Sequence, residues 1–352
     1  MANNGTFNNI LVRGVDTVGT FVLATPFYRA LRRNYPSSKI VLCIKPLVRE
    51  LAANCPYMDE VIIYDKKKYG GEFGFIRELR SRQFDAAFVL SGSFHSALIC
   101  YLAGIKNTIG YPHDRRGFLL THKIPDNNKH CVEYLLNIIE QLGGAVESRE
   151  PELWFSDDDF SKGSQILKAA GLNRDDKIIG IGFGAAGESA RRWPTENWTG
   201  LIRNIIEDKR VKVVLFGTKK DLEESAVIER GVADGRLINL INRTNTVKLA
   251  EFAACVKGCA AYVSVDTGGI HVAAALGVPV VGLYVPGSDD RWGARTLKGG
   301  PAPSLISKKT PCAPCDQSKM RRCRDNICMR AITAEDVGRA LIGVPPAPPS
   351  VR

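Results

Sequence analysis

Apolar runs alternate with helix-like segments along the first half of the chain. The runs predict strands at residues 9–12, 40–44, 61–64 and 86–90. Between the first two, a helix is predicted over 20–33, where Ala24, Tyr28 and Leu31 fall at helical spacing. Continuous apolar strands that alternate with helices are typical of a parallel sheet with helices on both faces. The first half therefore predicts a series of βαβ units.

The same pattern restarts in the second half. Strands are predicted at 177–183 and 212–216, and helices at 198–206 and 247–256. Each half opens with a strand and a glycine-rich turn, which indicates two similar α/β domains. We divide the chain into a first domain (1–155), a linker region (156–176), a second domain (177–332), a C-terminal helix (333–344) and a disordered proline-rich tail (345–352).

Residues 263–287 have the most informative pattern: a buried strand, a glycine turn, a short helix and a second buried strand. Asp266 and Thr267 are placed to cap the helix, and Gly268 and Gly269 allow backbone N–H groups to approach a ligand. A helix that begins in this way offers N–H donors and the positive end of its dipole to a diphosphate. The alternative is an ordinary capped helix between two core strands.

This segment resembles the signature of glycosyltransferase family 9, the ADP-heptose:lipopolysaccharide heptosyltransferases. The positions that match the family pattern S-x-D-T-G-x-x-H-x-A-A-A-L-G-x-P-V-V-x-L-x-x-P are Asp266, Thr267, Gly268, His271, Gly277, Pro279 and Pro286. The resemblance implies the GT-B architecture, an α/β fold with two facing Rossmann-like domains and an interdomain cleft. It also implies inverting transfer of a heptose from ADP-heptose to a hydroxyl of a lipopolysaccharide core or a related acceptor. As in relatives, we expect the helix at 334–342 to cross back to the first domain.

The resemblance extends to a donor-binding loop at 187–198. There Arg191, with Arg192 beside it, falls on the basic position that contacts the donor diphosphate. A guanidinium can bind phosphate through two hydrogen bonds and offset the charge of the departing ADP. Asp221 matches the acidic position that binds the ribose. The alternatives are solvated loop arginines and, for Asp221, a helix N-cap. The implied donor site consists of Arg191, Arg192, Asp221, Asp266, Thr267, Gly268, Gly269 and His271.

The first domain departs from the family pattern at the presumed catalytic base. Residues 13–26 align without a gap to a turn whose final aspartate has that role, but the position is Thr20 here. A threonine hydroxyl cannot act as a general base near neutral pH, because its alkoxide form is inaccessible. Asp16 is the remaining carboxylate of the turn. Either Asp16 has taken over the role or the enzyme is impaired.

The formal net charge of +11 indicates an anionic partner. No module that combines aromatic and basic residues for nucleic acid is visible, so we do not expect nucleic acid. A phosphorylated glycolipid in a membrane fits this charge. The basic residues of the first domain that are candidates for the acceptor site are Lys45, His95, Arg115 and Arg116. Each can also be a solvated surface residue.

The N-terminal segment MANNGTFNN lacks the basic and apolar regions of a signal peptide. The longest nearly apolar run, 272–285, is too short to span a bilayer and is broken by Gly277 and Pro279. We therefore expect a cytoplasmic protein with peripheral contact at the inner face of the membrane.

Four of the ten cysteines cluster in the loop 311–329. They are Cys312, Cys315, Cys323 and Cys328, in the spacing C-x2-C-x7-C-x4-C. In a cytoplasmic chain this spacing predicts a tetrahedral thiolate site for structural zinc or iron, kept ionised by the neighbouring lysines and arginines. The alternative is a set of reduced or reversibly oxidised thiols on a basic loop. No catalytic metal is expected, since the helix dipole and the arginines supply positive charge.

Two other functions stay open. One is a protein O-heptosyltransferase, whose acceptor is a polypeptide hydroxyl. The other is a sugar-nucleotide-binding protein without catalytic activity, which is motivated by Thr20. A screen of nucleotides and nucleotide sugars for binding separates enzymes that use ADP-sugars from all other classes.

Overall fold

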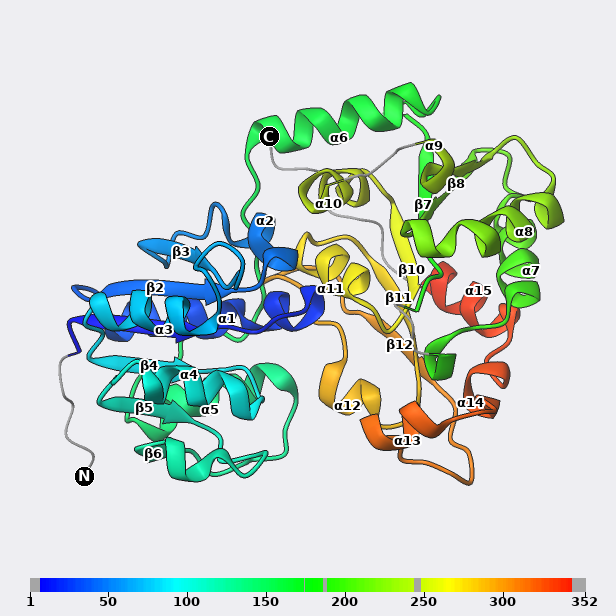
Figure 1. Cartoon of the computed structure of the whole chain (residues 1–352). Helices are drawn as coiled ribbons and strands as arrows, with labels where there is room; N and C mark the ends of the chain where they lie inside the picture. Colours follow the sequence, from blue (N-terminus) through cyan, green and yellow to red (C-terminus); the bar gives the residue numbers. More distant parts are fainter. Residues whose placement is uncertain (1–6, 174, 186–188, 244–247, 344–352) are drawn as a thin grey trace. The chain divides into compact units, whose positions relative to one another are not determined.

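The computed structural model describes residues 7–173, 175–185, 189–243 and 248–343. The chain divides into two compact units, Met1–Trp154 and Phe155–Arg352. Each unit contains a six-stranded sheet with helices packed against it (Figure 1). The proline-rich tail expected at 345–352 lies outside the described residues.

The sheet of the first unit has the strand order β3-β2-β1-β4-β5-β6 and is parallel throughout. Its strands are β1 (Asn9–Arg13), β2 (Lys39–Ile44), β3 (Glu60–Ile63), β4 (Ala86–Val89), β5 (Asn107–Gly110) and β6 (His122–Lys123). Its helices are α1 (Val18–Asn34), η1 (Pro46–Val48), α2 (Arg49–Ala52), α3 (Glu72–Ser81), α4 (Phe94–Leu102), η2 (Arg116–Leu119) and α5 (Cys131–Gln141). The chain order reverses between β1 and β4, and open parallel sheets bind ligands at the carboxyl ends of such strands.

The sheet of the second unit has the order β12-β11-β10-β7-β8-β9 and is also parallel. Its strands are β7 (Lys177–Gly182), β8 (Val211–Phe216), β9 (Leu237–Asn239), β10 (Ala261–Val265), β11 (Val280–Tyr284) and β12 (Ser304–Ser307). Its helices up to β10 are α6 (Asp157–Ala169), η3 (Ser189–Arg191), α7 (Thr195–Ile205), η4 (Lys219–Asp221), α8 (Leu222–Val232), α9 (Leu240–Arg243) and α10 (Leu249–Lys257). Those after β10 are α11 (Gly268–Ala275), α12 (Ser288–Trp292), α13 (Gln317–Arg322), α14 (Ile327–Arg330) and α15 (Ala334–Gly343). Here the order reverses between β7 and β10.

Most of the segment 156–176, which the sequence presents as a linker region, is helix α6. Ser156 and Asp159 close a capping box at its start: Ser156 Oγ accepts from Asp159 N at 3.2 Å, and Asp159 Oδ2 accepts from Ser156 N at 2.9 Å. Gly163 lies against α10, where an added Cβ would come within 2.3 Å of Ala254 Cβ. This glycine therefore allows α6 to pack closely on α10.

The C-terminal helix α15 packs within the second unit, beside α7 (Figure 1). Val337 of α15 is fully buried in the same core as Trp193, Trp198 and Ile332. The indole N–H of Trp193 donates to the carbonyl oxygen of Ile332 at 2.9 Å. The expectation that this helix crosses back to the first domain is wrong, because α15 packs on α7 and buries Val337 in the core of the second unit.

Candidate functional site

The start of α11 lies at the carboxyl end of β10, one of the two strands where the order reverses. Thr267 is the N-cap residue, with extended backbone, but its side chain makes no capping hydrogen bond. Its hydroxyl lies 3.2 Å from Ser264 Oγ instead. The carboxylate of Asp266 accepts from Ser288 Oγ at 2.5 Å. The predicted capping by the Thr267 side chain is therefore wrong. The N–H groups in the first turn of a helix have no partner within the helix, so they are suited to bind an anion.

Close packing against the aromatic side chains of Tyr262 and Phe252 explains why residue 269 is a glycine. An added Cβ at Gly269 would come within 2.7 Å of the hydroxyl of Tyr262 and 3.2 Å of the ring of Phe252. Gly268 precedes it as the first residue of α11, and His271 is 4% exposed on the same helix. The predicted residues of this segment therefore lie together, with His271 inside the unit.

Arg191 is held against the same turn. Its Nη1 donates to the backbone oxygen of Asp266 at 3.1 Å, and its Nε lies 3.6 Å from Asp266 Oδ2. The side chain of Arg191 is 19% exposed and that of Asp266 is 5% exposed. A guanidinium thus lies beside the positive end of α11, although the two residues are 75 positions apart in the sequence.

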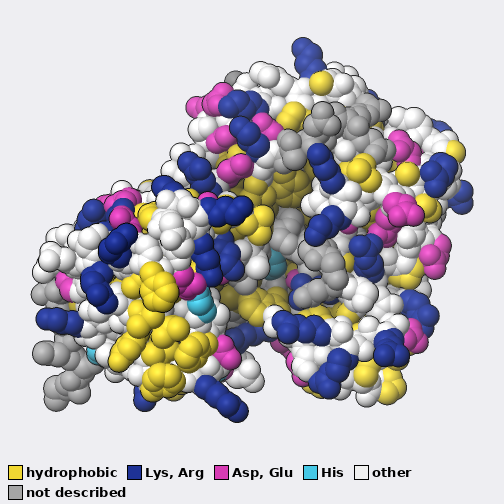
Figure 2. All heavy atoms as spheres, in the orientation of Figure 1, with side chains coloured by type: hydrophobic (Ala, Val, Ile, Leu, Met, Phe, Trp, Pro, Cys, Tyr) yellow, Lys and Arg dark blue, Asp and Glu magenta, His cyan; other side chains and the backbone are white. Residues whose placement is uncertain are grey.

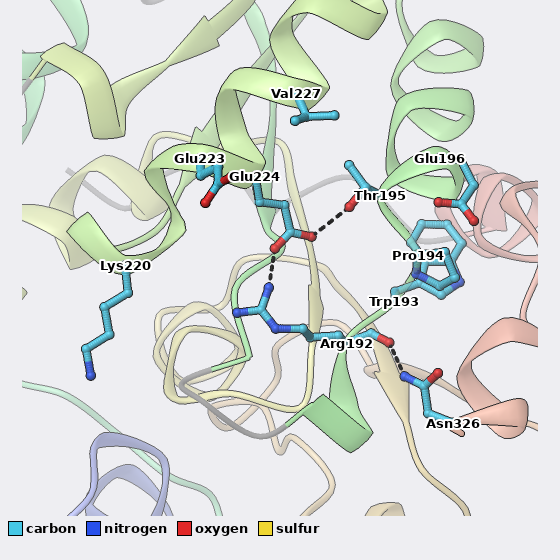
Figure 3. A pocket seen from close by; sticks show the side chains of 10 residues that line it. All are labelled: Arg192, Trp193, Pro194, Thr195, Glu196, Lys220, Glu223, Glu224, Val227 and Asn326. Atoms are coloured by element: carbon cyan, nitrogen blue, oxygen red, sulfur yellow. Dashed lines mark hydrogen bonds and ion pairs between the residues drawn. The ribbon is translucent and has the colours of Figure 1, made fainter. Parts of the chain in front are cut away.

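Arg192 has a different environment. Its guanidinium pairs with the carboxylate of Glu224 on α8, and Thr195 Oγ1 donates to the other carboxylate oxygen at 3.1 Å. Figure 3 shows Arg192 extending toward Glu224, in a pocket of about 600 Å³ that Lys220 and Asn326 also line. The two neighbouring arginines therefore contact different elements: Arg191 the start of α11, and Arg192 helix α8.

Asp221 lies at the carboxyl end of β8 and is 6% exposed. Its Oδ2 accepts from the backbone N–H of Thr218 at 2.9 Å and from the Thr218 hydroxyl at 2.8 Å. These bonds close a capping box at the start of η4, in which Thr218 is the N-cap residue. The alternative of a helix N-cap is wrong for Asp221, because its side chain makes no capping hydrogen bond to α8. The carboxylate also faces the loop after β7, where an added Cβ at Gly184 would lie 2.7 Å from its oxygens.

Two cations hold Asp16 at the carboxyl end of β1. Arg13 donates to both carboxylate oxygens, at 3.1 and 3.2 Å, and Lys45 Nζ lies 3.0 Å from Oδ2. Arg13 is 2% exposed and donates further to the backbone oxygens of Gly14 and Cys43. Arg13 is not among the predicted site residues, although the end of a buried strand is an unusual position for a charged side chain.

Thr20 lies in the first turn of α1 and contacts Thr17. Its hydroxyl donates to the backbone oxygen of Thr17 at 3.1 Å and lies 2.7 Å from the Thr17 hydroxyl. The structure thus brings Asp16 and Lys45 together and gives Thr20 bonds within its own turn.

The other candidates for the acceptor site differ in exposure. His95 pairs with Glu72, which also binds Lys66 Nζ at 2.7 Å, and Arg115 is exposed. Arg116 is fully buried and donates to the backbone oxygens of Tyr111, Ser91 and Ser93. Burial lowers the pKa of Arg116. Its assignment to the acceptor site is therefore wrong, because its donors are used by the fold.

The clustered cysteines do not form the expected metal site. Within the described parts of the chain, no group of three or more His, Cys, Asp or Glu side chains is placed to hold a metal ion. Cys312 is exposed, whereas Cys328 is buried among core residues. Burial and then the neighbouring Cys323 and Cys312 raise the pKa of Cys315, and burial also raises the pKa of Cys328. The expectation of a structural metal on these cysteines is therefore not supported by the described residues.

The two units are doubly wound α/β folds, a class in which ligands bind where the strand order reverses, at the carboxyl ends of the strands. The chain belongs to glycosyltransferase family 9 (heptosyltransferase), whose model matches residues 73–322. Lipopolysaccharide heptosyltransferase 2 of Escherichia coli (strain K12) is 31% identical over 293 residues, which cover 80% of this chain and 84% of that protein.

Solved structures agree with the family. The ADP-heptose lipopolysaccharide heptosyltransferase II of E. coli is 26% identical, with a TM-score of 0.75, and the match covers 95% of this chain and 97% of that one. A family 9 glycosyltransferase of Veillonella parvula is 23% identical, with a TM-score of 0.82, covering 95% and 96%. The predicted GT-B class of α/β fold is confirmed, and the chain is a glycosyltransferase. Every helix in the described ranges is too short or too polar to span a bilayer.

Proposed function

We propose that the chain transfers a heptose from ADP-heptose to a hydroxyl of a phosphorylated lipopolysaccharide core. The observation that carries the proposal is Arg191, held beside the uncapped start of α11 at the switch point of the second sheet. The names of the relatives support the identity of the sugar and the acceptor. We infer that the reaction takes place in the cytoplasm, at the inner face of the membrane that holds the acceptor.

The donor is proposed to bind the second unit through its diphosphate. The N–H groups of Gly268 and Gly269 and the guanidinium of Arg191 donate to the phosphate oxygens. Asp221 accepts from the ribose hydroxyls through the carboxylate oxygen that does not bond Thr218. Positive charge from Arg191 and the helix dipole stabilises the ADP as it leaves. Arg192 is assigned to the structural pair with Glu224 rather than to the diphosphate.

The acceptor is proposed to bind the first unit beside Asp16. The acceptor oxygen attacks C1 of the heptose as the bond from C1 to the diphosphate oxygen breaks, and the configuration at C1 inverts. Asp16 takes the proton of the acceptor hydroxyl, which supplies base catalysis. Arg13 and Lys45 orient the carboxylate, and Lys45 is exposed enough, at 50%, to contact a phosphate of the acceptor core as well.

Incubation of the purified full chain with ADP-heptose and a core acceptor that lacks this heptose tests the proposal. Mass spectrometry is expected to show an acceptor heavier by one heptosyl residue and an equal amount of ADP, whereas UDP-sugars give no product. Labelling of a polypeptide in place of the core would favour the protein O-heptosyltransferase. Binding of ADP without transfer to either acceptor would favour a protein without catalytic activity.

A further inference from the structure

Helix α4 presents apolar side chains to solvent as well as to the core. Its buried side consists of Ser96, Ala97, Ile99 and Cys100. On its other side Tyr101 is 57% exposed and Leu102 is 38% exposed. A helix that is apolar all round normally buries both sides, so the outer side of α4 lacks the cover that its composition indicates.

The exposed apolar area continues onto the neighbouring elements. Phe118 of η2 is 72% exposed, and its ring lies 6.1 Å from that of Phe94. Phe73 of α3, the helix that packs beside α4, is 85% exposed. We call this area the α3–α4 surface, and its residues are Phe73, Phe94, Leu98, Tyr101, Leu102 and Phe118. Figure 2 shows hydrophobic side chains gathered on this part of the first unit. Contiguous exposed apolar area of this kind marks an interaction site.

Basic residues border the α3–α4 surface. Those that are exposed on the same segments are Lys67, Lys68, Arg77, Arg80, Lys106 and Arg115. Figure 2 shows Lys and Arg side chains around the hydrophobic area. Aromatic residues surrounded by lysine and arginine are typical of proteins that lie on anionic membranes, where rings enter the headgroup layer and cations contact lipid phosphates.

The nearby acidic groups are already engaged. Glu72 pairs with Lys66 and His95, and Glu78 pairs with Arg82. Asp114 accepts from the backbone N–H of Phe94 at 2.9 Å, at the start of α4. The charges of Glu72 and Glu78 are therefore paired with cations. The exposed lysines and arginines outnumber Asp65 and Asp114, so the border of the α3–α4 surface is positive on balance.

The surface begins at the edge of the sheet that carries the proposed acceptor site. Helix α4 follows the carboxyl end of β4, as Asp16 follows β1 and Lys45 follows β2, and these strands are parallel neighbours. We propose that the α3–α4 surface docks on the anionic lipid bilayer in which the acceptor glycolipid is embedded. This inference rests on the proposed function, because it assumes that the acceptor is a membrane glycolipid. Docking would hold the acceptor headgroup at the same edge of the sheet as Asp16.

Sedimentation with vesicles tests the docking directly. The full chain is mixed with vesicles of phosphatidylethanolamine and phosphatidylglycerol, or of phosphatidylcholine alone. The wild type is expected to bind the anionic vesicles, and Phe73→Ser combined with Phe118→Ser to lower that affinity at least about tenfold. Ile342→Ser, at an 87% exposed position of α15, is the matched control and leaves it unchanged. Equal binding by all three proteins would overturn the proposal.

Two further measurements distinguish membrane docking from self-association and from failure of the proposed transfer reaction. Sedimentation equilibrium without lipid is expected to show the same mass for wild type and double variant; a wild-type dimer that the variant loses would assign the surface to a second copy. In the transfer assay, the double variant is expected to raise KM about tenfold for acceptor embedded in vesicles, with kcat and KM unchanged for a deacylated, water-soluble acceptor. If the wild type transfers to neither acceptor, the proposed function fails while vesicle binding still decides whether the surface docks.

Discussion

Replacement of Arg191 by alanine is expected to weaken ADP binding strongly. The guanidinium lies beside the start of α11 and is oriented by its bonds to Asp266, so it is ready to donate to a diphosphate without reorganisation. Hydrogen bonds to charged groups contribute about 1.5–3 kcal/mol each. Loss of one such bond corresponds to a decrease in affinity of roughly 10- to 150-fold, since 1.4 kcal/mol is a factor of ten.

Isothermal titration calorimetry with ADP measures this decrease. Arg192→Ala is the matched control, because that adjacent guanidinium pairs with Glu224 and should leave the affinity within about threefold of wild type. Thermal unfolding of both variants checks that the loss is not caused by a damaged turn. Unchanged ADP affinity in Arg191→Ala, or an equal loss in Arg192→Ala, would refute the assignment of the diphosphate to this turn.

Three further changes test the folded framework. Arg116→Ala should lower the free energy of unfolding by about 3 kcal/mol, because it leaves buried carbonyl groups without a donor. Arg115→Ala, at the exposed neighbouring position, should change it by no more than about 0.5 kcal/mol, and urea denaturation measures both variants. The backbone N–H of Thr333 and the Lys308 ammonium lower the pKa of Asp336 to about 2. The contribution of Asp336 to the free energy of unfolding is therefore complete above the unfolded pKa near 4 and is lost as the pH falls toward 2. In Asp336→Asn, the free energy of unfolding should depend less on pH over this range. Ser288→Ala removes the donor to a buried carboxylate beside α11 and should cost about 1–3 kcal/mol, and no change in calorimetric unfolding would contradict that bond.

Hydrophobic pattern was sufficient to predict the sheet strands that are long and buried. The predicted strand at 40–44 corresponds to β2 (Lys39–Ile44), and that at 212–216 to β8 (Val211–Phe216). The pattern missed β5 and β6 because Asn-Thr-Ile-Gly and His-Lys carry no apolar run. Such short strands form through pairing with a neighbour, which a local pattern does not contain.

Two pairs of adjacent arginines show why the contacts of the site residues could not be predicted from the sequence. Arg115 and Arg116 have the same local context, yet one is exposed and the other is fully buried. Arg191 contacts the start of α11, whereas Arg192 pairs with a residue of α8. The direction of each side chain depends on elements that are distant in the sequence. For this reason only the family resemblance, and not the local pattern, distinguished Arg191 from its neighbour.

The role of Asp16 is the point on which a catalytic account of this chain depends most. Its carboxylate is held by Arg13 and Lys45, whereas Thr20, at the family's usual position of the base, bonds within its own turn. Asp16→Asn keeps the size of the side chain and removes its basicity. Steady-state transfer of heptose from ADP-heptose to the core acceptor, by wild type, Asp16→Asn and Thr20→Asp, is therefore the most direct test. We expect Asp16→Asn to lower kcat by about 10²–10⁴-fold with ADP affinity retained. Unchanged turnover in Asp16→Asn together with a large gain in Thr20→Asp would contradict the account.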